Sequence, residues 1–371
     1  MSEYQCYEFV ALDRPLTAKQ MAELRAISTR AEISPTRFWN EYQWGDLKAD
    51  PARLVERYFD AHLYFANWGT HRLMLRIPKA RLDLKALKPY FVGRYAARLT
   101  SIGEHVLIDL GSDTEEPEYD EQSQGSLAAL SPLRAELMRG DLRPPYLAWL
   151  LAVSADDLDD DAEEPSVPAG LAELSAAQEA MVEFLRIDVD LVSAATSASA
   201  AVAKDDAPFR SWLAALPTKE KDAWLTLAAH DPELGLGGEL LRAFRATTKA
   251  EHHGTRRTVR ELRALANAQR AEREKAEAER ARKTKAQADA TRQRHLTKLA
   301  RNVEGAWSKL EKLVEASDYD VAVKLAIDLR DLATREATAP AFTRRLEALR
   351  KRQLRRRGFF DRWKRANEND L

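Results

Sequence analysis

The residues best suited to metal binding or acid–base chemistry are two histidines and the carboxylates next to them. Asp60 and His62 are separated by one residue, so on a strand both side chains point to the same face. Glu104 directly precedes His105 in a later strand. If the two strands meet, Asp60, His62 and His105 offer ligands for one metal, or an acid–base pair. The competing interpretation is ordinary polar residues at strand ends, which we favour because no complete ligand set is specified.

The C-terminal segment has the composition of a nucleic-acid contact. Residues 344–365 contain 11 Lys and Arg against 2 acidic residues, and such density binds phosphate backbones through counterion release. Aromatic residues are interleaved with these charges and could stack on bases. The alternative is an amphipathic terminal helix that contacts the acidic segments or a partner protein. The residues assigned to a nucleic-acid contact are Arg355, Arg356, Arg357, Arg362, Trp363 and Lys364.

Other chemical motifs fail on spacing or composition. His252 and His253 are adjacent, so on a helix they point in different directions and chelate poorly. The glycine-rich string at 234–238 lacks the lysine and hydroxyl residue of a phosphate loop. Cys6 is the single cysteine, so it forms no intramolecular disulfide and indicates a reducing compartment. We therefore assign no catalytic residue, expect no cofactor, and favour a role other than catalysis.

The elements that would position Asp60 and His62 form a mixed α+β domain at residues 1–111. Residues 4–12 have the aromatic and β-branched composition of a first strand. Two further pairs of strands are joined by tight turns, which imply antiparallel pairing. The predicted hairpins join 62–68 to 72–77 and 94–102 to 105–110, and helices are expected to start after Thr17 and Asp50.

The middle of the chain alternates between acidic and helical composition. Residues 112–168 are expected to be acidic linkers flanking short helices, because the acidic stretches contain few large apolar groups. The first linker is expected at 111–125 and the second at 155–168. Residues 169–250 are expected to form a small helical domain.

Residues 251–316 are predicted to form one long charged helix. Between Ala266 and His295 no apolar side chain is larger than alanine, so this stretch can bury little surface. Its helicity would depend on helix propensity and charge pairs, and it would act as a rigid spacer. The charge pairs expected within this helix are Glu272–Lys275, Glu277–Arg280, and Glu279 with both Arg282 and Lys283.

Residues 317–371, which follow the long helix, are predicted to form a helical hairpin and the basic tail.

The charge of the chain is strongly segregated. A length of 371 residues predicts two or three folding units, and the net charge is only −1. Residues 112–165 nevertheless carry 15 acidic against 3 basic groups, whereas residues 241–301 carry 18 basic against 7 acidic groups. This asymmetry indicates either intramolecular attraction or separate partners of opposite charge.

With no basic, apolar leader and no apolar stretch of about 18 residues, we expect a cytoplasmic protein without a membrane partner.

Four phrases of the sequence are similar to those of a known family. They are YEFVALDRPLT, RYFDAHLYFANWGTHRLMLRIP, WLAALPTKEKDAWL and YDVAVKLAIDLRDLA. Together they resemble an uncharacterised family of bacterial hypothetical proteins over most of the chain outside the acidic segments. The resemblance implies no activity and no catalytic residues.

These observations predict an α+β N-terminal domain with antiparallel strands, followed by an all-α region with a long charged helix and a C-terminal helical hairpin. The leading functional hypothesis is a non-enzymatic adaptor that binds a protein partner and contains a long helical spacer. The alternative is a nucleic-acid-associated protein that uses the basic helix and the Arg-rich tail. A second alternative is a metal-dependent enzyme whose site lies in the N-terminal domain.

Overall fold

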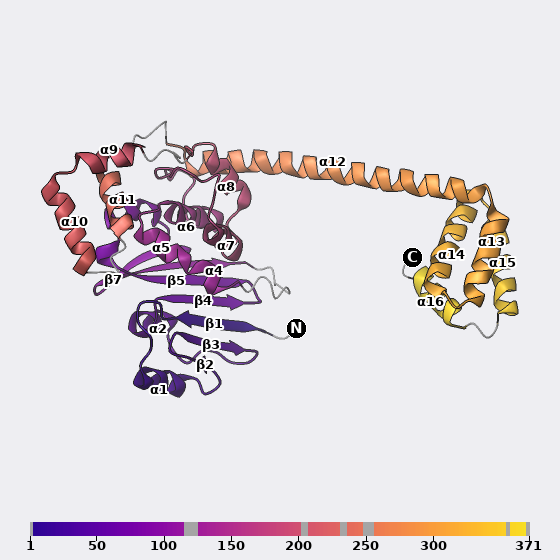
Figure 1. The fold of residues 1–371 in the computed structure, drawn as a ribbon, viewed down its shortest axis with the longest axis horizontal. Helices are drawn as coiled ribbons and strands as arrows, with labels where there is room; N and C mark the ends of the chain where they lie inside the picture. Colours follow the sequence, from indigo (N-terminus) through magenta and orange to yellow (C-terminus); the bar gives the residue numbers. More distant parts are fainter. Residues whose placement is uncertain are drawn as a thin grey trace. The chain divides into compact units, whose positions relative to one another are not determined.

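The chain forms an antiparallel sheet with helices, followed by a mostly helical region, so the predicted fold class is confirmed (Figure 1). The computed structural model describes residues 3–114, 125–201, 207–230, 236–247, 256–353 and 357–368. The chain divides into two compact units, residues 1–272 (unit 1) and residues 273–371 (unit 2). One long helix, α12 (Val259–Ala300), begins in unit 1 and ends in unit 2.

Unit 1 is built on a seven-stranded antiparallel sheet with the strand order β2-β3-β1-β4-β5-β7-β6. The five predicted strands are confirmed, and the sequence analysis missed β2 and β3, which extend the sheet beyond β1. The strands are β1 (Gln5–Val10), β2 (Glu32–Ile33), β3 (Arg37–Tyr42), β4 (Ala61–Ala66), β5 (Thr70–Pro78), β6 (Ala97–Ile102) and β7 (His105–Asp113).

Local sequence signals set the turns and helix starts of this sheet. Gly69 lies between β4 and β5 with φ +112°, and a Cβ there would meet the Thr114 carbonyl oxygen at 2.1 Å, so only glycine fits. Thr17 and Gln20 form the predicted capping box of α1 (Ala18–Ile27). Asp50 accepts a hydrogen bond from the Ala52 N–H at the start of α2 (Pro51–Tyr58), also as predicted.

The sheet is covered on both faces because successive residues of its central strands are apolar. In β5, Leu73 and Leu75 belong to a core on one face of the sheet, and Met74 belongs to a core on the other face. The core that contains Leu73 and Leu75 packs against the helices that follow β7 (Figure 1). The core that contains Met74 packs against α1 and α2. The helices on that side are α4 (Leu127–Leu130), α5 (Pro132–Met138), α6 (Arg143–Ser154), α7 (Ala176–Phe184) and α8 (Val189–Thr196), and α3 (Leu84–Leu87) connects β5 to β6.

The second predicted acidic linker, within residues 155–168, is instead a packed part of unit 1. Glu164 is 3% exposed and accepts two hydrogen bonds from Arg257, at 2.7 and 2.8 Å. The Tyr146 hydroxyl donates to the same carboxylate. The prediction is wrong because acidic composition indicates a solvated linker only where cationic partners are lacking. Glu164 and Asp161 have such partners, Arg257 and Arg260, 93 and 99 residues later in the chain.

Three further helices follow α8 in unit 1 and precede α12. The first and the third of them contact each other through aromatic rings: the centroids of Phe209, Trp212 and Phe244 are 5.5 to 5.7 Å apart. All three rings are half-buried, so this region buries less apolar surface than the sheet does. The helices are α9 (Ala207–Ala215), α10 (Thr218–His230) and α11 (Leu236–Thr247).

Helix α12 keeps its helical conformation through an exposed stretch, as predicted. Every residue from 271 to 291 is exposed. The expected pair Glu279–Lys283 is present at 2.6 Å, and Arg273–Glu277 forms an unpredicted pair at 3.4 Å. The helix ends at Ala300 rather than near residue 316, because Asn302 caps a new helix by accepting from the Gly305 N–H. The predicted single helix is therefore two helices.

Unit 2 packs its helices around α14, which contacts the other three helices that follow α12. Its core includes Trp307, Leu310, Leu329 and Phe359. None of the described helices has the length and hydropathy that a membrane span requires. The four helices are α13 (Val303–Glu315), α14 (Tyr319–Arg335), α15 (Ala339–Arg352) and α16 (Arg357–Glu368).

The buried Glu164–Arg257 pair is expected to be a major support of unit 1. Arg257→Ala leaves the Glu164 carboxylate buried without its counter-charge, so we expect the free energy of unfolding to fall by about 3 to 5 kcal/mol. Urea denaturation followed by circular dichroism measures this change. The neighbouring Arg256→Ala removes an exposed ion pair with Glu163 and should cost only about 0 to 1 kcal/mol. Equal losses in the two variants would contradict the assignment.

Candidate functional site

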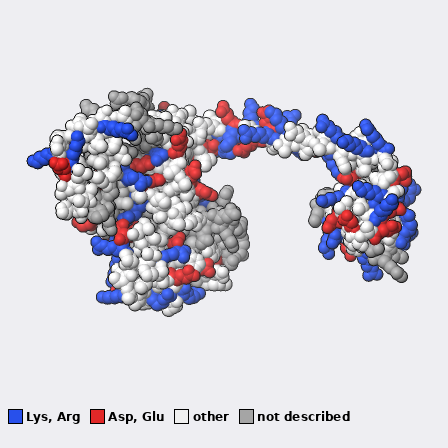
Figure 2. Space-filling view, viewed as in Figure 1, with Lys and Arg blue, Asp and Glu red and all other residues white. Residues whose placement is uncertain are grey.

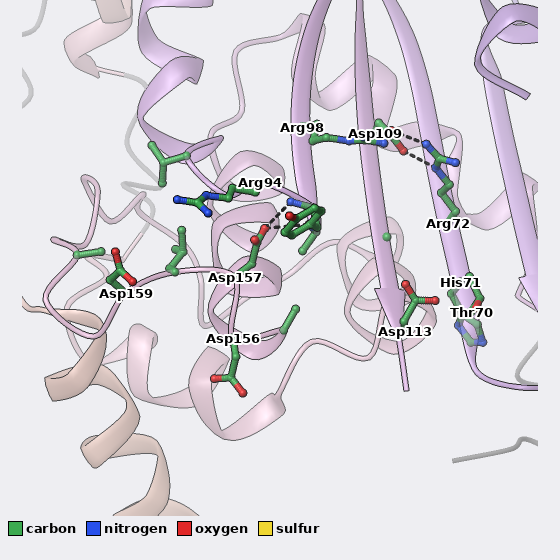
Figure 3. Close-up of a pocket in the computed structure, with 17 residues that line it drawn as sticks. Thr70, His71, Arg72, Arg94, Arg98, Asp109, Asp113, Asp156, Asp157 and Asp159 are labelled. Atoms are coloured by element: carbon green, nitrogen blue, oxygen red, sulfur yellow. Dashed lines mark hydrogen bonds and ion pairs between the residues drawn. The ribbon is translucent and has the colours of Figure 1, made fainter. Parts of the chain in front are cut away.

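The candidate site of unit 1 is a cavity of about 790 Å³ beside strands β5, β7 and β6. This volume lies in the range of small-molecule pockets. Its remaining walls are the segment before β6 and the acidic segment after α6 (Figure 3). The charged residues of the lining are Arg72, Arg94, Arg98, Asp109, Asp113, Asp156, Asp157 and Asp159.

Asp109 is the electrostatic centre of one wall. Arg72 donates two hydrogen bonds to its two oxygens, each at 2.7 Å, and Arg98 donates to one of the same oxygens (Figure 3). Burial acts to raise the pKa of Asp109, but the hydrogen bonds and charge of Arg72, followed by Arg98, outweigh burial and hold that pKa below its ordinary value. Asp109 is therefore ionised at neutral pH and committed to its two arginines.

Two further aspartates of the lining hold the cavity wall in place. One Asp157 oxygen accepts the backbone N–H groups of Tyr95 and Ala96 at 2.7 and 3.0 Å, which fixes the entry into β6. Asp156 forms an ion pair with Arg263 of α12 at 2.5 Å. These carboxylates shape the cavity, and their hydrogen-bonding capacity is partly used in doing so.

The groups left to meet a ligand are one cation and two acids. Arg94, Asp113 and Asp159 are exposed, and in the described part of the chain their side chains form no hydrogen bond or ion pair. Tyr95 adds an aromatic ring that is 77% exposed. This set can bind a small molecule that carries both charges, by ion pairing and ring contact.

His71 also lines the cavity, but both of its ring nitrogens serve the fold. Arg186 can only donate, so Nε2 of His71 accepts from it at 2.9 Å. Nδ1 then carries the proton and donates it to the Phe184 carbonyl oxygen. His71 is buried and stacked on the Phe184 ring, so it joins β5 to the C-terminal end of α7 as a neutral imidazole.

Asp60, His62 and His105, the candidates for a metal or acid–base site, do not form one site, and each has a different structural role. The Asp60 carboxylate accepts from the Leu12 and Asp13 N–H groups at 2.7 and 2.9 Å, and from Arg76 at 2.6 Å. Burial acts to raise its pKa, but these donors lower it below the ordinary value. Asp60 thus anchors the chain that leaves β1.

His62 is a core residue. It is fully buried, and its ring stacks on Phe9 with 4.0 Å between the ring centroids. Its Nδ1 donates a hydrogen bond of 2.9 Å to the Glu8 carbonyl oxygen. Burial lowers its pKa to about 3, so the ring is neutral. His105 is half-buried, and burial lowers its pKa too. Within the described ranges no three His, Cys, Asp or Glu side chains are grouped to hold a metal.

The basic tail is largely integrated into unit 2. Trp363 is half-buried against Phe342, with ring centroids 6.0 Å apart. Arg362 pairs with Asp320 at 2.7 Å. Lys364 is exposed and Arg357 begins α16 at an exposed position. Arg355 and Arg356 lie outside the described residues. Trp363 is thus packed in the helical core, which weakens the expectation that it stacks on a base.

The sequence analysis missed the Arg72–Asp109–Arg98 cluster, although a signal was present. Asp109 stands within the apolar run at residues 106–110 of β7, and Arg72 directly precedes the apolar run at residues 73–75 of β5. The turn at Gly103 pairs Ile102 with His105, and counting back along both strands sets Arg98 opposite Asp109. The hairpin register alone therefore predicts that pair.

Comparison of the chain with protein-family models, with curated proteins and with solved structures finds no match. The site must therefore be interpreted from its own geometry.

The lowered pKa of Asp109 predicts a pH dependence of stability. A carboxyl whose pKa is lower in the folded than in the unfolded state stabilises the fold above the unfolded value of about 3.9, and the contribution is lost as the pH falls through the folded value. We expect acid to lower the free energy of unfolding less steeply in Asp109→Asn than in the wild type. Urea titrations from about pH 6 downward measure this slope.

Asp113→Asn is the matched control, because its exposed side chain forms no ion pair within the described ranges. It should keep the wild-type slope. An unchanged slope in Asp109→Asn would show that the arginine pairs do not hold this carboxyl ionised.

Proposed function

We propose that the protein is a non-enzymatic adaptor in which α12 acts as a helical spacer between two interaction modules. The observation that supports this proposal is the exposed stretch 271–291, which stays helical although it buries no side chain. A helix of this kind contributes little to a core, so its length and stiffness are the properties left for function.

The first end of α12 is fixed within unit 1. Val259, Leu262 and Ala266 are buried in the core between the sheet and the helices that follow β7. Arg263 binds Asp156 and Asp160, and Arg270 binds acidic residues at the start of α8. Apolar burial and guanidinium–carboxylate pairs together hold the direction in which the helix starts.

The other end of α12 is fixed within unit 2. Leu296 is buried, and Arg292 forms ion pairs with both Asp328 and Asp331 of α14. His295 contacts Asp328 at 2.7 Å. These contacts begin just after the exposed stretch ends, so the helix has an anchor on either side of it.

The exposed stretch itself has only local support. An i,i+4 pair on a helix surface contributes about 0.2 to 0.5 kcal/mol, and Arg273–Glu277 and Glu279–Lys283 are of this kind. Alanine, lysine, arginine and glutamate, which dominate the stretch, are strong helix formers. Anchors at both ends also remove the cost of starting a helix there, since the turns at each end are already formed.

The adaptor proposal predicts two sets of partners. The tagged full-length chain is expressed in cells, the lysate is treated with nuclease, and proteins are then cross-linked. Different proteins should be attached to residues 1–272 and to residues 273–371. Both sets of proteins should be recovered together with the tagged chain. Mass spectrometry of the cross-linked peptides identifies the attachment points. Cross-links confined to one unit would contradict the proposal.

The spacer is tested by Ala281→Pro, which breaks the helix at an exposed position at a cost of about 3 kcal/mol. We expect each partner to be retained but their joint recovery to fall several-fold. Ala281→Ser is the control, because serine fits the exposed helix and should preserve joint recovery. Unchanged joint recovery in Ala281→Pro would show that a continuous helix is not needed.

A further inference from the structure

The two units carry opposite net charges that nearly cancel in the whole chain. Residues 273–371 contain 26 Lys and Arg against 16 Asp and Glu, a net charge of +10, whereas residues 1–272 have a net charge of −11. A charge of this size on 99 residues attracts polyanions and raises their association rates. Unit 2 is therefore the part of the chain that we expect to contact a polyanion.

Many cations of the helices in unit 2 are already paired with carboxylates. Arg345 binds Glu304 with two hydrogen bonds of 2.6 Å, Arg352 binds Glu311 at 2.7 Å, and Arg362 binds Asp320. Arg292 binds two aspartates of α14. These arginines hold the helices together, so a polyanion would have to compete with an existing ion pair at each of them.

The second half of α12 differs, because four of its cations lie in a line along one side of the helix and are exposed. The four residues are Arg280, Lys283, Arg294 and Lys298. Successive members are 3, 11 and 4 residues apart, which is close to one, three and one turns of an α-helix, so all four lie on one side of it. They form what we call the basic stripe. All four are exposed, and in the described part of the chain Arg280, Arg294 and Lys298 form no ion pair or side-chain hydrogen bond. Lys283 has one exposed pair, with Glu279.

Neither acids nor packing interrupt the basic stripe. The single acidic residue between Arg280 and Arg301 is Asp289, which is nine residues, or two and a half turns, beyond Arg280 and so faces the opposite side of the helix. Lys and Arg side chains gather along the C-terminal half of α12 in Figure 2. The stripe is about 27 Å long at 1.5 Å per residue.

From this surface we propose that the basic stripe of α12 binds the phosphate backbone of a nucleic-acid duplex. Phosphates follow one another at about 3.4 Å of axis along each strand, so a stripe of about 27 Å meets several of them. The stripe holds no aromatic ring, so it offers phosphate contacts without base stacking and predicts binding that is insensitive to sequence. A lipid surface fits less well, because residues 271–291 have no apolar side chain larger than alanine to insert.

This inference goes beyond the adaptor role and does not depend on it. Of the two regions predicted to contact nucleic acid, it keeps the basic helix and does not use Trp363, whose ring is packed against Phe342.

The experiment measures binding of the purified full-length chain to fluorescent DNA and RNA duplexes of about 30 base pairs by anisotropy, between about 50 and 200 mM salt. Four phosphate contacts predict a slope of log affinity against log salt of about −3 to −4. A preference for one duplex identifies which nucleic acid supplies the phosphates. Absence of binding at the lowest salt, or equal competition by polyglutamate of the same charge, would overturn the proposal.

Variants locate the contact. Replacing Arg280, Arg294 and Lys298 by Glu should lower affinity at least about tenfold at low salt and reduce the slope by about 2 to 3. The same three positions changed to Gln should give a smaller loss in the same direction, with helicity by circular dichroism unchanged in both variants.

A matched control changes three other exposed cations of unit 2, Lys309, Lys312 and Arg344, to Glu. It alters the net charge by the same amount and should leave affinity within about threefold. A loss equal to that of the stripe variant would overturn the stripe in favour of net charge alone. Loss of binding on reversal of residues 355–357, with the stripe variant unaffected, would place the contact in the tail instead.

Discussion

A helix that buries nothing along its middle needs anchors at its ends, and α12 depends on this constraint. Residues 271–291 of α12 are exposed throughout, so hydrophobic burial cannot fix them. Anchoring falls to Val259, Leu262 and Ala266 in unit 1 and to Leu296 in unit 2, with arginine–aspartate pairs beside both sets. The segregation of charge along the sequence follows in part from this need, because the arginines at the base of α12 require acidic partners.

The acidic segment after α6 shows how this requirement is met. Four of its exposed acids, Asp156, Asp160, Asp161 and Glu163, bind arginines at the start of α12 or just before it. Glu164 does so inside the protein, where Arg257 and Tyr146 supply its hydrogen bonds. The same segment lines the cavity beside β6, since Asp156 and Asp157 belong to both. The cavity wall and the helix base therefore share one support.

Local signals in the sequence were sufficient for five of the seven strands, for the caps of α1 and α2, and for the exposed part of α12. The Thr17 capping box, the turns at Gly69 and Gly103, and the lack of large apolar residues after Ala266 are each decided by near neighbours. What could not be foreseen depends on distant partners: Glu164 looks like a solvated acid until Arg257 is placed beside it. The Arg98–Asp109 pair is intermediate, because strand register alone would have predicted it.

The helix at residues 271–291 is stable without burial, and its rigidity can be measured directly. Spin labels on cysteines introduced at Ala271 and Ala290, with the buried Cys6 replaced by alanine, allow pulsed electron paramagnetic resonance to measure the distance directly. The account predicts one narrow distribution consistent with about 28 Å between the two Cα atoms, from 19 residues at 1.5 Å each. A broad distribution typical of a flexible chain would contradict it.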